Sequence, residues 1–390
     1  MLYFKRFGGK FRLSMKPFDY IISGAGASGL TLAHLLLEHK NKHSILIIDK
    51  DDKTRNDRTW CFWQKGDNLY EEIVSHQWSE IQVKGSSFNE TYDITPYQYK
   101  MVRGIDYYNF LKPQLLASSQ VTWVKEDVQR IEPSGIVVTN KGTYRGRIVF
   151  NSTIDYQQLE FEKSNNILQH FKGWIIETDE NVFNPNCATY MDFSVDQEAD
   201  CRFGYVLPFT KNKALVEFTL FNKTLLEDEA YDARLHAYIK KLGINQFEIL
   251  EEEKGVIPMT DFPFQIKESK HVFNIGILGG FAKASTGYSF LRAQKILKQM
   301  VLNIELNKEI TSNLPHQKVR FKKYDATLLD ILRNKKFTGE DLFVSLFEKN
   351  GAHVILKFLD EETSLAEELK IMSSTPILDF GKSFIKQLMK

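Results

Sequence analysis

The 390-residue sequence is long for one compact core, because domains usually contain roughly 100–200 residues, so we expect two or three interwoven units. Its 51 basic and 50 acidic residues nearly cancel, which excludes the basic field of a nucleic-acid-binding protein and the acidic excess of a disordered one. Three widely spaced cysteines form no Cys-x-x-Cys pair, and the nine histidines form no zinc motif. We therefore predict a reduced, cytoplasmic protein without a metal site.

No segment is typical of a membrane-spanning helix, since the uncharged stretch 20–37 is rich in glycine, serine and threonine. The first eighteen residues carry five basic side chains and no acid, without the continuous apolar run of a signal peptide. They are either a basic surface tail or a stretch preceding a true translation start at Met15 rather than Met1.

The predicted elements begin with a β-α-β unit: an apolar strand at 18–23, a helix at 28–40 and a second apolar strand at 44–49. Residues 100–116 predict a helix, and strand-like runs follow between 121 and 153. Residues 173–222 alternate apolar and polar side chains in several runs, which indicates an antiparallel sheet. The remaining pattern predicts a helix at 226–241, a strand at 255–259, a helix at 287–304 and a helical region from 325 onward.

These elements predict an α/β fold with a Rossmann-like dinucleotide-binding domain, an antiparallel-sheet substrate domain and a helical C-terminal region. We expect the dinucleotide-binding domain to comprise residues 18–75, 100–155 and 265–305. The substrate domain is expected at 156–264 and the helical region at 306–390.

The loop after the first strand has the glycine pattern of a dinucleotide site. Gly24 permits a tight turn, Gly26 lets backbone N–H groups approach a pyrophosphate, and Gly29 allows close packing of helix on strand. Asp49 follows Gly29 by twenty residues, at the end of the second strand, where a carboxylate accepts hydrogen bonds from ribose hydroxyls. A glycine turn without a ligand is the alternative. The expected cofactor-binding residues here are Gly24, Gly26, Ala27, Ser28, Gly29 and Asp49.

A second glycine-rich segment lies far along the chain, at 276–288. FAD is long enough to need such a second contact, whereas NAD is not, so we predict FAD. A helix cap that serves packing alone is the alternative. The residues expected near the flavin end are Gly279, Gly280, Thr286 and Gly287.

The string NDRTWCFW at 56–63 resembles the lycopene cyclase family closely. Similar segments follow in order as far as Met372, so the resemblance covers nearly the whole chain from Asp19; they include YMDF (190–193), FGYVLP (203–208), LVEFT (215–219), EKGVIPM (253–259) and STGY (285–288). The resemblance implies a flavoprotein fold like that of aromatic hydroxylases, with FAD kept reduced by NAD(P)H. It also implies that the ends of lycopene, or of a related linear carotenoid, are closed to β-rings by an isomerase-type reaction without net redox change.

Two positions depart from the family pattern. The family has two adjacent acids where this chain has Glu217 followed by Phe218, so we expect one carboxylate to suffice. Ala284 replaces a proline, which concerns only the rigidity of a turn. The acids at 360–362 imitate an acid pair but belong to another segment, and we interpret them as solvated surface on a charge-rich helix.

Closing a β-ring requires a carboxyl that stays protonated near neutral pH, which burial in an apolar pocket achieves. Glu217 in the run ALVEFTLF is the expected catalytic acid, unless strand alternation turns it to solvent. Asp192 is expected to share the proton or to position the cofactor, and Glu253 to stabilise its loop. Arg58 and Arg103 are expected to contact the cofactor, with a surface salt bridge as the alternative for each.

The carbocation formed during ring closure needs π density or negative charge in a dry site. Four aromatic residues are candidates for this role, with plain core packing as the alternative for each: Tyr205, Phe193, Phe218 and Tyr288.

Because the implied substrate is insoluble in water, we expect peripheral contact with the cell membrane. The last ten residues suggest a basic amphipathic helix with Lys382, Lys386 and Lys390 on one face. Its apolar residues either contact lipid or pack onto the core. Apolar clusters at 342–347 and 354–359 are expected to roof the substrate tunnel or to share in docking.

Two other functions remain open at this point. One is an FAD-dependent monooxygenase or polyene saturase that acts on an apolar substrate. The other is a carotenoid-binding or membrane-docking protein with a vestigial flavin fold.

Overall fold

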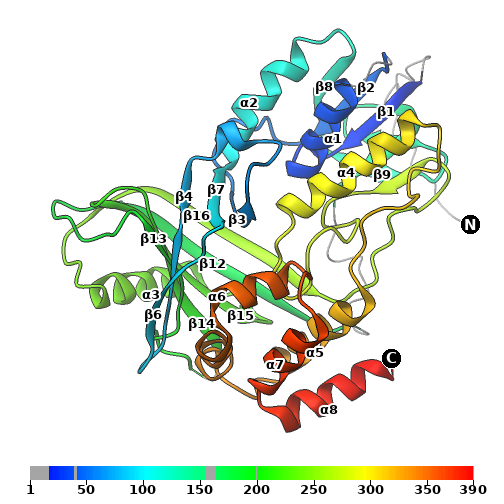
Figure 1. Ribbon diagram of the computed structural model, residues 1–390. Coiled ribbons are helices and arrows are strands. Elements are labelled where there is room, and N and C mark those ends of the chain that lie inside the picture. Colours follow the sequence, from blue (N-terminus) through cyan, green and yellow to red (C-terminus); the bar gives the residue numbers. More distant parts are fainter. Residues whose placement is uncertain (1–16, 39–41, 154–163, 199, 390) are drawn as a thin grey trace, which may run out of the picture.

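The computed structural model describes residues 17–38, 42–153, 164–198 and 200–389, which form three β-sheets with helices packed around them (Figure 1). The basic N-terminal segment and both candidate starts, Met1 and Met15, lie outside the described residues. Within the described part of the chain, no helix combines the length and apolar character needed to cross a membrane.

The first sheet contains the predicted β-α-β unit. Its seven strands are β1 (Phe18–Ser23), β2 (Ile45–Asp49), β8 (Val121–Lys125), β9 (Val128–Ile131), β10 (Ile136–Thr139), β11 (Thr143–Asn151) and β17 (Val272–Asn274). The strands β8, β2, β1, β11 and β17 pair in parallel, while β9 and β10 extend the sheet in antiparallel fashion. Helices α1 (Ala27–Leu37) and α4 (Phe290–Glu305) pack together over it, which explains why β1 and β2 are nearly continuous apolar runs.

The second sheet is the expected antiparallel one, and it is larger than the sequence indicated. Its strands are β5 (Glu80–Lys84), β6 (Asn89–Asp93), β12 (Asn166–Glu177), β13 (Cys187–Asp192), β14 (Cys201–Pro208), β15 (Lys213–Asn222) and β16 (Glu248–Thr260). They lie in the order β16-β12-β15-β14-β13-β5-β6, and only the β13–β5 pair is parallel. The strand expected at 255–259 therefore begins at 248, in an acidic stretch. Residues 76–99, which belonged to no expected domain, contribute β5 and β6.

A three-stranded sheet joins the two larger ones. It consists of β3 (Thr59–Lys65), β4 (His76–Trp78) and β7 (Tyr97–Arg103), and a short 3₁₀ helix (Glu71–Ile73) precedes β4. Successive residues of β3 enter different cores: Phe62 packs with the α1 and α4 side, and Trp63 packs with the second sheet. The helix predicted from residue 100 is α2 (Gly104–Leu116). Residues 100–103 belong instead to β7, whose alternate residues Tyr97, Tyr99 and Met101 are buried.

The second sheet is covered on both faces (Figure 1). Helix α3 (Asp228–Lys241) packs on one face, where Tyr231, Leu235 and Tyr238 meet apolar residues of β12, β14 and β15. The other face meets the C-terminal helices, whose helical region starts at Val319 rather than at Asp325. These helices are α5 (Val319–Arg333), a π-helix (Glu340–Val344), α6 (Ser345–Leu359), α7 (Leu365–Ser373) and α8 (Ile377–Leu388). The domain boundaries themselves stay a prediction.

The contact between α3 and the sheet depends on Gly204 of β14. A Cβ at this position would lie 2.1 Å from the ring of Tyr238, so Gly204→Ala is expected to destabilise the protein by about 1–3 kcal/mol, the usual cost of overpacking a core. Urea unfolding followed by circular dichroism measures this loss. Gly142→Ala is the control, because a Cβ there meets its nearest atom at 3.9 Å. Equal unfolding midpoints for both variants would contradict this account.

Candidate active site

The glycine turn after β1 leaves one side of the N-terminus of α1 open. Gly24 has φ +96°, and its N–H donates to the Ile48 carbonyl at 2.8 Å. A Cβ at Gly29 would lie 1.9 Å from the Gly24 oxygen, so helix and turn are as close as backbones allow. A Cβ at Gly26, by contrast, would meet no atom within 4 Å. An anionic group can therefore approach the backbone at Gly26 and at the first helical residues, Ala27 and Ser28.

Asp49 lies beside this turn, at the end of β2. Its carboxylate accepts hydrogen bonds from the N–H of Ala25 (2.6 Å) and of Asp51 (2.8 Å), and Lys53 Nζ is 3.7 Å away. The fold thus brings Asp49 next to the glycine turn, as the motif predicted. This is the arrangement in which a carboxylate meets the ribose of a dinucleotide.

The late glycine segment packs against the first one. A Cβ at Gly276 would lie 3.2 Å from Ser28 Oγ, and Gly279 lies tightly against the backbone at Asn274. Gly280 (φ +72°) and Gly287 (φ +71°) adopt the left-handed conformation that favours glycine. The helix expected from 287 begins at Phe290, because residues 281–289 form a loop.

The two arginines expected near the cofactor both have carboxylate partners. Arg103 Nη2 donates to both carboxylate oxygens of Glu251, at 2.9 and 2.8 Å. Arg58 is half exposed, and its Nη2 lies 3.3 Å from Asp57 Oδ2. The salt-bridge alternative is therefore present for each, and cofactor contact by either arginine stays a prediction.

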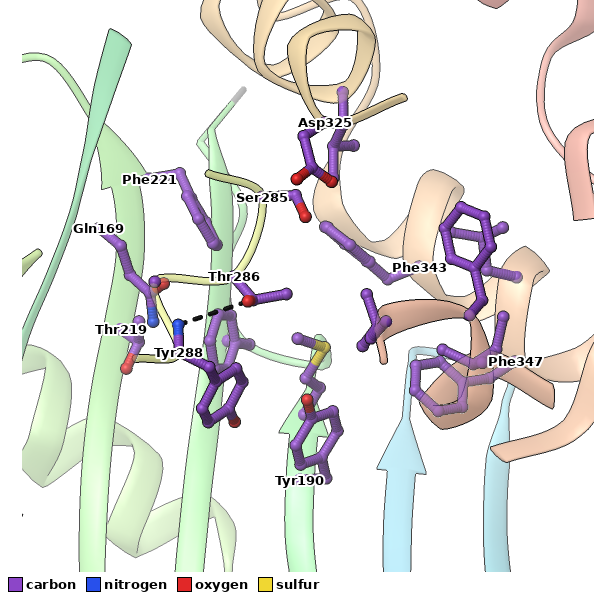
Figure 2. A pocket seen from close by; sticks show the side chains of 18 of the residues that line it. Gln169, Tyr190, Thr219, Phe221, Ser285, Thr286, Tyr288, Asp325, Phe343 and Phe347 are labelled. Atoms are coloured by element: carbon purple, nitrogen blue, oxygen red, sulfur yellow. Dashed lines mark hydrogen bonds between the residues drawn. The ribbon is translucent and has the colours of Figure 1, made fainter. Parts of the chain in front are cut away.

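A cavity of about 540 Å³ lies between the second sheet and the C-terminal helices. Figure 2 shows Gln169, Thr219 and Phe221 on the sheet side, with Phe343 and Phe347 facing them from the helical side. Its volume falls within the range of small-molecule sites, and most of its wall is aromatic or aliphatic. Other lining residues include Thr286 and Gly287 of the late glycine segment, so the cavity reaches the region where we expected the flavin end. Of the expected roof clusters, Leu342, Val344, Val354 and Leu356 do not line it. The members that do are Phe343, Leu346, Phe347, Ile355, Phe358 and Leu359.

Glu217 points into this cavity and is only 8% exposed. In the sheet register it lies opposite Tyr205 of β14 and opposite Gly173 of β12, and Gly173 lies opposite Glu253 of β16. Directly opposite residues share a face, so Tyr205, Glu217 and Glu253 all enter the cavity. Gly173 leaves the space between the two acids, since a Cβ there would lie 2.6 Å from Glu217 Cγ.

The surroundings of Glu217 favour its protonated form. Burial raises its pKa well above the usual range, and the charge of Glu253 together with a hydrogen bond between the two carboxyls raises it further. Thr59 Oγ1 donates to Glu253 Oε2 at 2.7 Å. A second carboxyl therefore lies beside Glu217, and it comes from β16 rather than from the position after Glu217. The expectation that one carboxyl suffices for catalysis stays a prediction. Glu253, expected to stabilise a loop, lies within a strand.

Tyrosine hydroxyls line the cavity beside Glu217. Tyr99 shares hydrogen bonds with Tyr205 (2.6 Å) and Tyr288 (3.1 Å). Burial raises the pKa of all three hydroxyls well above the usual value, and it also raises the pKa of the adjacent Cys61 thiol. These groups are therefore neutral over the working pH range and offer dipoles and ring faces, not charge.

A third carboxylate, Asp325 of α5, also lines the cavity (Figure 2). Its Oδ2 accepts from Lys283 Nζ at 3.0 Å and from Gln317 Nε2 at 2.6 Å, and all three side chains are buried. Asp325 is therefore tied to two buried partners on the helical side of the cavity, Lys283 and Gln317.

Asp192 lies on the opposite face of the sheet from the cavity. Its carboxylate accepts from the Tyr238 hydroxyl of α3 at 3.0 Å and from the Ser194 N–H at 3.0 Å, and it does not line the cavity. Asp192 is therefore not placed to give a proton to a substrate in this cavity. Phe218 also belongs to the core beneath α3, and Phe193 packs on Phe343 outside the lining, so of the four aromatic candidates Tyr205 and Tyr288 line the cavity.

The acids at 360–362 form the turn between α6 and α7 rather than part of a helix. Glu362 is exposed, as expected. Asp360 is also in contact with solvent, but burial raises the pKa of its carboxyl to about 6, so it is not an ordinary solvated acid. Glu361 is not solvated surface, because its carboxylate lies 3.5 Å from Lys283 and 3.7 Å from Arg292, with 12% of the side chain exposed. This segment therefore connects the C-terminal helices to the late glycine segment.

A family model described as "Lycopene cyclase protein" matches residues 19–383. The chain belongs to the lycopene cyclase family. Two curated relatives illustrate the similarity. The chain is 28% identical over 304 residues to "Neoxanthin synthase, chloroplastic" of Solanum tuberosum, which covers 72% of this chain and 59% of the relative. It is 25% identical over 294 residues to "Lycopene beta-cyclase" of Pantoea ananas, covering 70% and 72%.

Solved structures share the fold of this lycopene cyclase family member at low sequence identity. A geranylgeranyl bacteriochlorophyll reductase-like protein from Thermoplasma acidophilum is similar with TM-score 0.66 and 12% identity, covering 95% of this chain and 99% of the other. The flavin-dependent brominase Bmp2 is similar with TM-score 0.52 and 12% identity, covering 94% and 92%. These likenesses confirm the expected fold class, a Rossmann-like domain of the aromatic-hydroxylase type with an antiparallel-sheet domain and a helical C-terminal region.

In this family member Glu253, which was expected to stabilise its loop, instead lies beside Glu217. Glu253 follows two other glutamates in the run EILEEEKG, which has the composition of a solvated surface. Successive side chains of a strand point to opposite faces of the sheet, and this alternation was the signal available in the sequence. Glu252 is exposed beside Lys172, whereas its neighbour Glu253 faces the cavity. Placing Glu253 next to Glu217 also required the sheet register, which is not local information.

Proposed function

We propose that this chain is an FAD-dependent lycopene β-cyclase that closes the ends of a linear carotenoid to β-rings with no net redox change. The observation that carries the proposal is a buried carboxyl with a raised pKa, Glu217, in an apolar cavity next to a dinucleotide-type turn. Membership of the lycopene cyclase family supports the substrate class. The matched region spans 59% of the neoxanthin synthases, so the activity is proposed for this chain rather than transferred.

The residues present fit FAD. The open backbone at Gly26 and the start of α1 suit a pyrophosphate, Asp49 suits a ribose, and the late glycine segment reaches from Ser28 to the cavity. If FAD binds in this way, the residues beside its flavin half would be Gly279, Gly280, Thr286 and Gly287. Reduced by NAD(P)H, the bound flavin would supply negative charge beside the cavity.

The protein's own groups account for the acid step. Glu217 donates its proton to the terminal double bond, which it can do because burial keeps it protonated at neutral pH. The apolar wall excludes water, which would otherwise capture the carbocation. The neutral ring faces of Tyr205 and Tyr288 stabilise the cation as it forms.

The alternative oxidoreductase functions differ in their use of reductant. Proteins of this fold include a reductase-like protein and an oxygenase, but that likeness concerns the fold alone. The deciding experiment incubates the reduced protein with lycopene in lipid vesicles under nitrogen and identifies the product. A cyclase forms β-rings and consumes no NADPH beyond the initial reduction, whereas a saturase consumes NADPH in proportion to product and a monooxygenase requires oxygen.

We expect Gly26→Val to lose FAD, because the branched side chain fills the space through which the pyrophosphate would approach the backbone. Flavin absorbance per mole of protein measures the loss, and circular dichroism checks the fold. Gly142→Val, in a turn far along the same sheet, is the control and should keep its flavin. A folded Gly26→Val protein with full flavin content would contradict the cofactor assignment.

We expect Glu217→Gln to bind FAD and fold normally but to cyclise lycopene at least about 100-fold more slowly, the usual scale for loss of general acid catalysis. The pH profile gives a second readout. Glu217 is active when protonated, and its raised pKa keeps it protonated to higher pH than an ordinary glutamate, so activity should persist through neutral pH and fall on the alkaline side. Near-normal turnover of Glu217→Gln would assign the acid elsewhere.

We further propose that the mouth of the cavity docks on a membrane surface. Leu369 of α7 (70% exposed) and Ile377 of α8 (64% exposed) face outward and also line the cavity. Further apolar side chains exposed on these helices, or directly after α8, are Leu365, Leu378, Ile385, Leu388 and Met389. An apolar surface around an opening suits a lipid interface, from which a water-insoluble polyene can enter directly.

Docking through the basic face expected on the terminal helix stays a prediction. Lys382 is exposed, Lys386 bonds to Asp330 at 2.6 Å, and Lys390 lies outside the described residues. Phe384 lines the cavity, whereas Ile385 and Leu388 are exposed rather than packed on the core. We propose that apolar contact supplies most of the binding.

We expect the double variant Leu369→Glu/Leu378→Glu to lose flotation with phospholipid vesicles while retaining FAD. Two charges on this surface oppose its transfer into the lipid interface. The control is Leu116→Glu, since Leu116 is 51% exposed on α2, at the opposite end of the molecule (Figure 1). If both variants float equally well with the vesicles, the α7–α8 surface does not dock on the membrane.

A further inference from the structure

The two glutamates in the cavity differ from their neighbours in what they face. Along β16, Glu251 pairs with Arg103, Glu252 with Lys172, and Lys254 with Asp228. Glu253 instead faces Glu217 across Gly173, and Thr59 donates to its other side. The sheet therefore places Glu217 and Glu253 against each other as a carboxyl pair, whereas Glu251 and Glu252 are paired with cations.

The titratable groups that face Glu217 are neutral, and the nearest charged side chain on the same face of β16, that of Glu251, is paired with Arg103 of β7. Cys61 of β3 and Tyr205 of β14 face Glu217, and burial raises the pKa of both, so neither is charged near neutral pH. Two adjacent carboxyls in a poorly solvated site do not both ionise, because the second negative charge repels the first. The pair therefore retains one proton, and its titration belongs to the pair as a unit.

We propose that Glu217 and Glu253 form one acid–base unit in which Glu217 gives a proton to the substrate and Glu253 takes up the proton that ring closure releases. This inference rests on the proposed function. It adds a catalytic residue that the acid role of Glu217 does not require.

The steps balance. The O–H bond of Glu217 breaks as a C–H bond forms at the terminal double bond, and the second double bond then attacks the resulting cation to form the ring C–C bond. The new cation loses a proton from the adjacent carbon, whose C–H electron pair becomes the ring double bond, and Glu253 accepts that proton. The pair ends with the one proton with which it began, and no electrons are exchanged. Both carboxyls are ionised only while the cation lies beside them, because its positive charge offsets the repulsion between them.

Infrared spectroscopy tests the pair without substrate. The wild-type holoprotein should show one buried carboxylic-acid C=O band at neutral pH, and Glu217→Gln should lack it. In Glu253→Gln the neighbouring charge is gone, so the pKa of Glu217 falls and the band should titrate at lower pH than in wild type. Glu253→Asp keeps the charge and should restore titration toward the wild-type pH. The control is Glu252→Gln, because Glu252 adjoins Glu253 but points to the opposite face.

Activity supplies the second measurement. Glu253→Gln should slow cyclisation at least about tenfold and move the alkaline limb of its pH profile to lower pH, whereas a residue with only a structural role would leave that limb in place. A Glu253→Gln protein with the wild-type infrared titration and wild-type rate would overturn the inference. If the wild-type protein fails to cyclise lycopene yet shows the shared-proton band, the proposed function fails and the carboxyl pair stands.

Discussion

Glu217 and Glu253 meet because the strand between them has no side chain at Gly173, and this contact requires the register of β14, β15, β12 and β16 to be right to the residue. A slip of one residue would turn the glutamates toward the other face of the sheet. The long pairing of β12 with β15, from Leu168 to Glu177, fixes that register. The chemistry of the cavity therefore depends on the continuity of the sheet as much as on the acids themselves.

The two faces of this sheet serve different purposes. Helix α3 covers one face with a dense core, where Asp192 is held by Tyr238 and Gly204 makes room for the same tyrosine ring. The C-terminal helices stand further from the other face and leave the cavity. Two acids that look equivalent in the sequence can thus have different roles, because successive strand residues point to opposite faces. Asp192 has a structural role on the α3 face, and Glu217 faces the cavity.

Local signals in the sequence were enough to predict the dinucleotide-type turn. Gly24, Gly26 and Gly29 are constrained by their immediate neighbours, and Asp49 follows from one β-α-β unit, so no distant contact is needed. The same holds for most elements of the first sheet. The helix expected at 100–116 is present, but it begins at Gly104, because apolar alternation in β7 runs directly into α2 without a break in composition.

The second carboxyl and the docking surface could not be predicted in this way. Glu253 lies in an acidic run that is ordinary for a solvated loop, and only cross-strand pairing shows that it is opposite Glu217 through Gly173. The lysines of α8 looked like membrane anchors by spacing alone, yet Asp330, more than fifty residues earlier in the chain, binds one of them. Such pairings depend on tertiary packing, which periodicity does not encode.

The position of the mouth between α7 and α8 has a consequence for how product is released. On the proposed function, a polyene enters end first, and its newly formed ring, bulkier than the linear end, must leave past Leu369 and Ile377 into the lipid. A carotenoid has two ends, and the second reaches the cavity only after the molecule has withdrawn and reoriented within the bilayer. If both proposals hold, the ratio of one-ring to two-ring products would depend on competition between re-entry and diffusion away in the membrane plane.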